Sequence, residues 1–235
     1  TVNVKDKFGN VIKIYETEEE RKEAMFWDHY GHFFQMGEWA IDRLFFRAWE
    51  EEILTYEKVI AFLETTWYND SMNRSYNGIP ITLQPINHLK SGINLLFHSL
   101  NEYKTGKPLD LTCAIDSLTL KVETILRLIC EQIQIPTFKI VSKPGEQPVK
   151  MEKLMDDLLN DLNPEQKETG FYIEDFYYLR YLMTLKIGQN LRNRVAHGLL
   201  DPDEYNFETA VSLFSLLLRL SRYRFQTDNN NDKIN

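Results

Sequence analysis

The chain has 235 residues, of which 43% are hydrophobic, and its 35 acidic against 27 basic side chains give a formal net charge of −8. This length permits one large domain with a buried core, and the composition is that of a globular protein. The negative charge disfavours tight, unspecific binding of nucleic acid, which depends on a broad basic surface. A selective, local nucleic-acid site stays open.

Targeting signals and cysteine usage point to the cytoplasm. No apolar run approaches the roughly 18 residues that a membrane-spanning helix needs, and the N-terminus lacks the apolar region of a signal peptide. Cys113 and Cys130 occupy positions that we interpret as buried helix, which favours a reducing environment. Thr1 stands where an initiator Met is expected, which suggests part of a longer protein.

The first elements are a hairpin and a long helix. Residues 2–15 alternate apolar and polar side chains around a turn-forming segment, which predicts a short β-hairpin. Thr17 and Glu20 have the spacing of a capping box and predict a helix start. The helical stretch that follows is rich in aromatic residues, and Gly31 and Gly37 are candidate breaks in it.

The remainder of the N-terminal region, residues 1–106, is predicted to be helical with one loop. A second helix is expected over residues 55–66. Residues 69–85 are rich in turn-forming types and predict a loop. A third helix is expected over residues 87–103, and Gly106 and Pro108 end it.

Residues 107–226 carry the clearest helical pattern. Apolar residues spaced 4, 3, 4, 3 and 4 apart predict one buried stripe: Leu111, Ile115, Leu118, Val122, Ile125 and Ile129. Proline and glycine then mark a long connection, with a strand near residues 137–141 and a short helix near 151–160.

The C-terminal part of this region is predicted to hold a second long core helix over residues 173–187. Asn190 is a candidate N-cap for a short helix that follows. Asp201 and Pro202 end it, and an apolar stripe predicts a last helix up to about residue 225. The tail, residues 227–235, is polar and is predicted to be disordered. The fold class is therefore mainly α, a helical bundle preceded by additional N-terminal helices and a hairpin.

Residues 192–198, Arg-Asn-Arg-Val-Ala-His-Gly, carry the strongest functional signal. Arg192 presents a permanent charge and planar donors that fit a phosphate, and His197 can exchange protons near neutral pH. Asn193 and His197 would share a helix face, whereas Arg192 would point about 140° away from His197 on an ideal helix. The structural alternative is a helix C-terminus whose basic residues complement the dipole, with Gly198 as its left-handed cap.

This motif resembles the HEPN superfamily, helical domains that usually carry an Arg, four to six residues, and a His. Many of its members are metal-independent ribonucleases, among them the RNase L type, several toxins and the type VI CRISPR effectors. Within it, the chain is similar to an uncharacterised domain family marked by an RNxxxHG motif. Residues 114–127 resemble that family's first core helix, with Glu123 four residues before Arg127, and residues 60–68 are similar to an upstream helix end. The resemblance covers about residues 108–226.

The resemblance implies a metal-independent endoribonuclease without a cofactor, acting on RNA as a homodimer, in a toxin, antiviral or RNA-degrading role. Arg192, Asn193 and His197 would form its catalytic group, with Arg194 adding local positive charge. Glu123 would lie near the motif and orient Arg192 or His197, whereas spacing alone makes Glu123 and Arg127 an ordinary surface ion pair. Asp116, on the same flank of the helix, is a weaker supporting candidate.

A second function from another class stays open. The chain could be a catalytically inert module that dimerises or binds a partner, its Arg-Asn-His network only fixing a helix junction. A nuclease should expose Arg192 and His197 beside basic surface, and a structural network should bury them with satisfied hydrogen bonds. His29 and His32 lack the partners of a metal site and are expected to be packing or surface residues, and His98 is expected to be partly buried and bonded to a neighbour.

Overall fold

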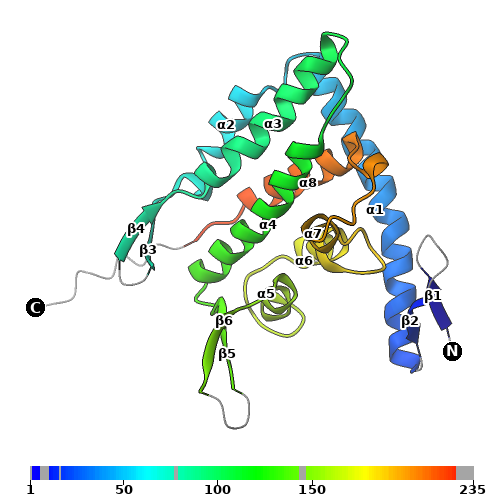
Figure 1. Cartoon of the computed structure of the whole chain (residues 1–235), viewed down its shortest axis with the longest axis vertical. Coiled ribbons are helices and arrows are strands. Elements are labelled where there is room, and N and C mark those ends of the chain that lie inside the picture. Colours follow the sequence, from blue (N-terminus) through cyan, green and yellow to red (C-terminus); the bar gives the residue numbers. More distant parts are fainter. Residues whose placement is uncertain (1, 6–10, 16, 77–78, 143–146, 226–235) are drawn as a thin grey trace, which may run out of the picture.

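The computed structural model describes residues 2–5, 11–15, 17–76, 79–142 and 147–225 (Figure 1). The protein is mainly helical, as predicted. The helices are α1 (Glu18–Glu50), α2 (Tyr56–Leu63), α3 (Ile86–Lys104), α4 (Thr112–Gln132), α5 (Met155–Leu162), α6 (Ile173–Leu179), α7 (Leu191–Ala196) and α8 (Phe207–Ser221). Three antiparallel hairpins pair β1 (Val2–Lys5) with β2 (Val11–Tyr15), β3 (Met72–Tyr76) with β4 (Ile79–Leu83), and β5 (Phe138–Val141) with β6 (Val149–Glu152).

Helix α4 is the centre of the bundle. All six residues of its predicted apolar stripe are at most 1% exposed, so the periodic pattern identified the core face correctly. The helix packs against α3, α5, α7 and α8. In Figure 1, α6 and α7 lie between α4 and the long helix α1. The described helices include none that is long and apolar enough to cross a membrane.

The N-terminal region and the bundle share one apolar core. The ring of Phe45 on α1 lies 5.3 Å from that of Phe214 on α8. The indole of Trp67 and the hydroxyl of Tyr68 donate hydrogen bonds to the carbonyls of Leu220 and Leu217, each at 2.8 Å. The Leu220 carbonyl lies in the last turn of α8, where carbonyls have no partner within the helix, so Trp67 completes that end of α8.

Helix α1 begins at the predicted cap and runs without a break. The Thr17 hydroxyl and the Glu20 carboxylate each accept a backbone N–H of the other residue, a complete capping box. Gly31 and Gly37 do not divide the helix. A Cβ on Gly31 would lie 2.7 Å from the hydroxyl oxygen of Tyr181, so this glycine permits the close approach of α1 to the segment after α6.

The loop prediction for residues 69–85 is wrong, because this segment forms the β3–β4 hairpin. Met72 pairs with Leu83, and Arg74 pairs with Ile81, in a regular antiparallel register. The strands are short and turn-forming residues dominate the composition of the segment, so the alternation of apolar and polar side chains was not recognised. The Asn-Gly pair at 77–78, a strong sequence signal for a two-residue hairpin turn, lies outside the described residues.

The second long core helix is shorter than predicted. Helix α6 ends at Leu179 and is followed by a π-helical turn over Arg180–Thr184. The Leu185 N–H bonds to the Arg180 carbonyl at 2.8 Å, and the Gln189 N–H bonds to the Tyr181 carbonyl at 2.9 Å. These bonds turn the chain back toward α7. The apolar pattern of the sequence continues through this turn, which is why it predicted a longer helix.

The other predicted elements agree within a few residues, with two corrections. The helix near residues 151–160 begins only at Met155, because β6 occupies the preceding residues. Cys130 is buried, which raises the pKa of its thiol to about 12, but Cys113 is exposed. Cys113 lies two residues from both Leu111 and Ile115, about 200° from the buried stripe on a helix. The predicted hairpin at 2–15 is present in its described strands, and the tail at 227–235 lies outside the described residues.

Stability should depend on the ionisation of Asp42 on α1. Burial, together with the charges of Glu38 and Glu208, raises the pKa of this carboxyl to about 7. The contribution of this raised pKa to the stability of the fold is fully present below the ordinary carboxyl range. It is lost as pH rises through about 7. We expect Asp42→Asn to be more stable than the parent at pH 8, with the difference shrinking toward pH 5, measured by urea unfolding. The exposed Asp28→Asn is the control, and a difference independent of pH would contradict the prediction.

Candidate functional site

The motif lies on α7, a helix of only six residues whose ends have special backbone geometry. Asn190 precedes it with φ of 50°, a left-handed conformation that Asn tolerates. The N-cap position is as predicted, but its side chain makes no capping bond and instead accepts a hydrogen bond from the Asn193 amide at 2.8 Å. Gly198 ends the helix with φ of 63°, and the Leu199 N–H donates to the Arg194 carbonyl at 2.7 Å. The predicted left-handed glycine cap is present.

Arg192 is held by α4. Its Nε donates to the Glu123 carboxylate at 2.9 Å, and its Nη1 donates to the Asn193 side-chain oxygen at 3.2 Å. Arg127 donates to the other oxygen of Glu123 at 2.8 Å. The Arg127, Glu123 and Arg192 side chains are only 19%, 16% and 23% exposed. The pair of Glu123 and Arg127 is therefore partly buried, and Glu123 joins two arginines from different helices.

The same carboxylate titrates below its usual range. Burial raises the pKa of Glu123, but hydrogen bonds from Arg127 and Arg192 and their charges outweigh it, so the net pKa is lowered. Glu123 is therefore ionised wherever the protein is folded near neutral pH. Arg127 extends the network to the β5–β6 hairpin, where it donates to the Lys153 carbonyl at 2.6 Å.

Arg194 and Asp116 hold the segment after the motif. The guanidinium of Arg194 makes a two-pronged ion pair with Glu204, with one bond at 2.8 Å. Glu204 also accepts the Asp201 N–H at 3.1 Å. The Tyr205 hydroxyl donates to Asp116 at 3.0 Å. These two candidates thus anchor the chain between α7 and α8.

His197 closes α7 and is exposed. Its N–H bonds to the Asn193 carbonyl at 3.1 Å, one helical turn earlier, in agreement with their predicted shared face. Its ring makes no hydrogen bond or ion pair with the residues that the structure describes. Arg192 likewise uses Nε and Nη1 but leaves Nη2 without a hydrogen bond among the described residues. The site thus combines an arginine held by hydrogen bonds, as the structural alternative predicts, with an exposed histidine, as the nuclease alternative predicts.

Carboxylates near the motif make one candidate metal group among the described residues. Ligand atoms of Asp201, Asp203 and Glu204 lie within 4.8 Å of one another. The Arg194 guanidinium already neutralises Glu204 in this group, which weakens the case for a cation. Of the other histidines, His29 donates from Nδ1 to the Met25 carbonyl at 2.6 Å, and His98 is exposed rather than partly buried as predicted, 3.8 Å from the Glu102 carboxylate. Neither belongs to this group.

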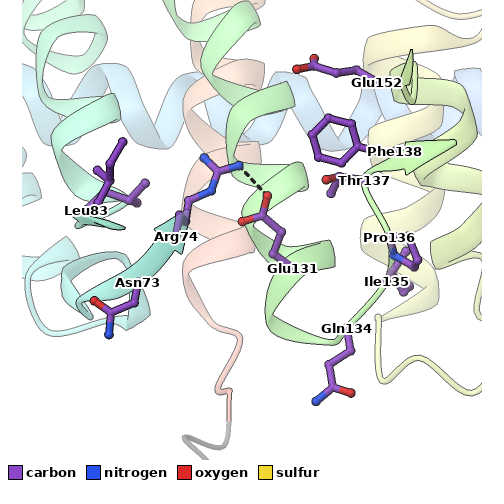
Figure 2. Close-up of a pocket in the computed structure, with 11 residues that line it drawn as sticks. Asn73, Arg74, Leu83, Glu131, Gln134, Ile135, Pro136, Thr137, Phe138 and Glu152 are labelled. Carbon is purple, nitrogen blue, oxygen red and sulfur yellow. Dashed lines mark hydrogen bonds and ion pairs between the residues drawn. The ribbon is translucent and has the colours of Figure 1, made fainter. Parts of the chain in front are cut away.

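A cavity of about 670 Å³ opens between the β3–β4 and β5–β6 hairpins at the C-terminal end of α4. Figure 2 shows Arg74 reaching Glu131 at its wall, an ion pair of 2.6 Å, with Phe138 opposite. None of the motif residues lines this cavity. The candidate site and the cavity are therefore separate features of the molecule.

Comparisons with protein-family models, with curated proteins and with solved structures give no match. The resemblance to the HEPN superfamily consequently depends on the quoted residues alone. The geometry adds that Glu123, Arg192 and Asn193 form one hydrogen-bonded network between α4 and α7, with His197 at the C-terminal end of α7.

Asn190, Glu204 and Tyr205 take part in the junction but were not among the site residues predicted from the sequence. Asn190 was identified only as a cap. A signal for Glu204 existed, since it stands three residues after Asp201 in the spacing of a capping box. The bond between Tyr205 and Asp116 spans 89 residues and has no local signal.

Removing the Glu123 charge should destabilise the junction. Glu123→Gln leaves two partly buried arginines without their carboxylate, and we expect a loss of about 1–3 kcal/mol in the free energy of unfolding at pH 7. The contribution of the lowered pKa to the stability of the fold is fully present above the ordinary carboxyl range. It is lost as pH falls through the lowered pKa of Glu123. The difference between parent and variant should therefore shrink on acidification. Urea unfolding of both proteins at several pH values, with exposed Glu168→Gln as control, measures it, and a constant difference would refute the assignment.

Proposed function

We propose that this chain is a metal-independent endoribonuclease of HEPN type, with Arg192, Asn193 and His197 at its site. The observation that carries the proposal is that two residues of the motif have different surroundings. Arg192 is oriented by Glu123 and Asn193, whereas the His197 ring at the end of the same helix is exposed. A fixed cation and an accessible proton carrier are the two groups that cleavage of a phosphodiester would use.

The chemistry follows from the residue types. His197 takes the proton of a ribose 2′-OH, or supplies one to the leaving 5′-oxygen. The 2′-oxygen attacks phosphorus, the bond to the 5′-oxygen breaks, and the products carry a 2′,3′-cyclic phosphate and a 5′-hydroxyl. Arg192 stabilises the charge that develops on the phosphate, for which Nη2 is open. Asn193 positions the Arg192 side chain through its amide oxygen.

The surroundings favour selective binding of RNA. The net charge is −8, and Arg194 is neutralised by Glu204. A long single strand would gain little from the general electrostatics of the surface. The family resemblance adds a homodimer and a cytoplasmic toxin, antiviral or RNA-degrading role to the proposal.

One observation favours a second function, an inert module for dimerisation or partner binding. Arg192 and Arg194 each form an ion pair with a carboxylate of the same chain. Such ion pairs fix a helix junction without any substrate. In that case the exposed His197 would be an ordinary surface residue.

Cleavage of RNA by purified protein decides between the two functions. We expect the parent to cleave a mixed pool of end-labelled RNA in excess EDTA, leaving cyclic-phosphate ends. His197→Ala should reduce the rate by about 100-fold or more, the usual contribution of a general base or acid.

The matched control is His98→Ala, which removes another exposed histidine, on α3. It should cleave as the parent does. Equal activity of the parent and His197→Ala would refute the role of His197. No cleavage by any of the three proteins, across several RNA classes, would favour the inert module.

A further inference from the structure

Helix α1 exposes an unusual set of large apolar side chains. Met25, Phe33, Met36, Trp39 and Leu44 are each between 60% and 72% exposed, and Phe26 is 42% exposed. We refer to these six residues as the outer face of α1. They span residues 25–44, which corresponds to roughly 28 Å along a helix.

The outer face lies opposite the core contacts of α1, except at its margin, where the Phe26 ring lies 5.0 Å from that of Tyr177 on α6. Trp27, Phe34, Phe45 and Trp49 point into the protein and are at most 7% exposed. Met36 is two residues from Phe34, which turns it about 200° away on a helix. The helix is therefore apolar on two sides, and one of them is covered by no other described helix. Figure 1 shows the other helices on one flank of α1 and the β1–β2 hairpin beside its N-terminal part.

The area of the outer face fits a protein interface. Six side chains that offer roughly 200 Å² each when extended leave about 700 Å² of apolar surface at these exposures. The largest apolar patch on a monomer usually covers about 300–600 Å². A stable interface of standard size buries about 800 Å² on each partner. One further copy of the same face supplies the matching area, because a two-fold dimer joins identical patches.

We propose that the outer face of α1 binds a second copy of this chain, with the two α1 helices antiparallel. This inference does not depend on the ribonuclease proposal. It uses a surface outside residues 107–226, on α1, and it needs no residue of the motif.

The residue order along α1 favours the antiparallel arrangement. If the two-fold axis passes the midpoint of the outer face, Met25 meets the partner's Leu44, and Phe33 meets the partner's Met36. His29 and His32 then meet the small Ala40 and Gly37 of the partner. A Cβ on Gly37 would have nothing within 4 Å in the single chain. Large and small side chains thus alternate as close helix packing requires.

Charge disfavours one other occupant of the outer face. The first turn of α1 is acidic, with Glu18, Glu19 and Glu20. A membrane surface, usually anionic, favours basic residues beside the apolar face. The acidic start of α1 and the net charge of −8 disfavour it.

Sedimentation velocity of the whole chain over a concentration series tests the interface. We expect a dimer for the parent and a monomer for the double variant Phe33→Asp, Met36→Asp, with the dissociation constant raised roughly 30-fold or more. The control is Ile140→Asp, which changes a side chain that is 77% exposed on β5 and should leave the dimer intact. Circular dichroism of each variant checks that the helices are retained.

Disulfide cross-linking tests the antiparallel register. In a Cys113→Ser background, the double variant His29→Cys, Ala40→Cys should form intermolecular disulfides on mild oxidation, and each single variant should not. A parent that stays monomeric, a double aspartate variant that still dimerises, or self-linking of the single His29→Cys variant would each overturn the proposal. So would binding of the monomeric parent to neutral or anionic vesicles that the double aspartate variant loses, which would assign the face to a membrane surface. Cleavage of RNA by these variants is read separately and bears only on the ribonuclease proposal.

Discussion

The carboxylate of Glu123, shared between Arg127 and Arg192, is the interaction on which the motif depends. A six-residue helix does not form by itself in water, because nucleation costs more than one turn returns. Helix α7 is held at the junction by Arg192 on Glu123 and by the buried Leu191. The long helix α4 supplies Glu123 from a flank next to its fully buried stripe, so the core fixes where this carboxylate stands.

The network continues from the junction in two directions. Through Arg127 it reaches the Lys153 carbonyl and so fixes the end of the β5–β6 hairpin against α4. Through Arg194 and Glu204 it fixes the turn between α7 and α8. Each of these contacts joins two segments that are stabilised mainly by apolar packing away from the junction. The polar junction therefore sets the orientation of α7, while the apolar stripes of α4 and α8 provide most of the stability.

The sequence predicted the elements that depend on local or periodic signals. The stripe from Leu111 to Ile129, the cap at Thr17 and the left-handed Gly198 needed only spacing and residue type. It failed where contacts without a periodic signal decide. The π-helical turn after α6 is closed by the bond from the Leu185 N–H to the Arg180 carbonyl, which the apolar pattern does not show. The approach of Glu123 to Arg192 spans 69 residues and entered the prediction only through the family resemblance.

Counting charges around Glu123 shows one local positive charge in an acidic protein. Two arginines share one carboxylate, so this cluster keeps one positive charge. The nearest further acid, Glu152, lies 3.9 Å from Arg127 and is 71% exposed, where water screens it. The Arg194 and Glu204 pair, in contrast, is neutral. Under the ribonuclease proposal, a single residual charge beside the open Nη2 of Arg192 attracts one phosphate rather than a whole strand. Under the ribonuclease proposal, substrate choice would then come from shape and from a second surface, and the general charge of the protein would act against unselected RNA.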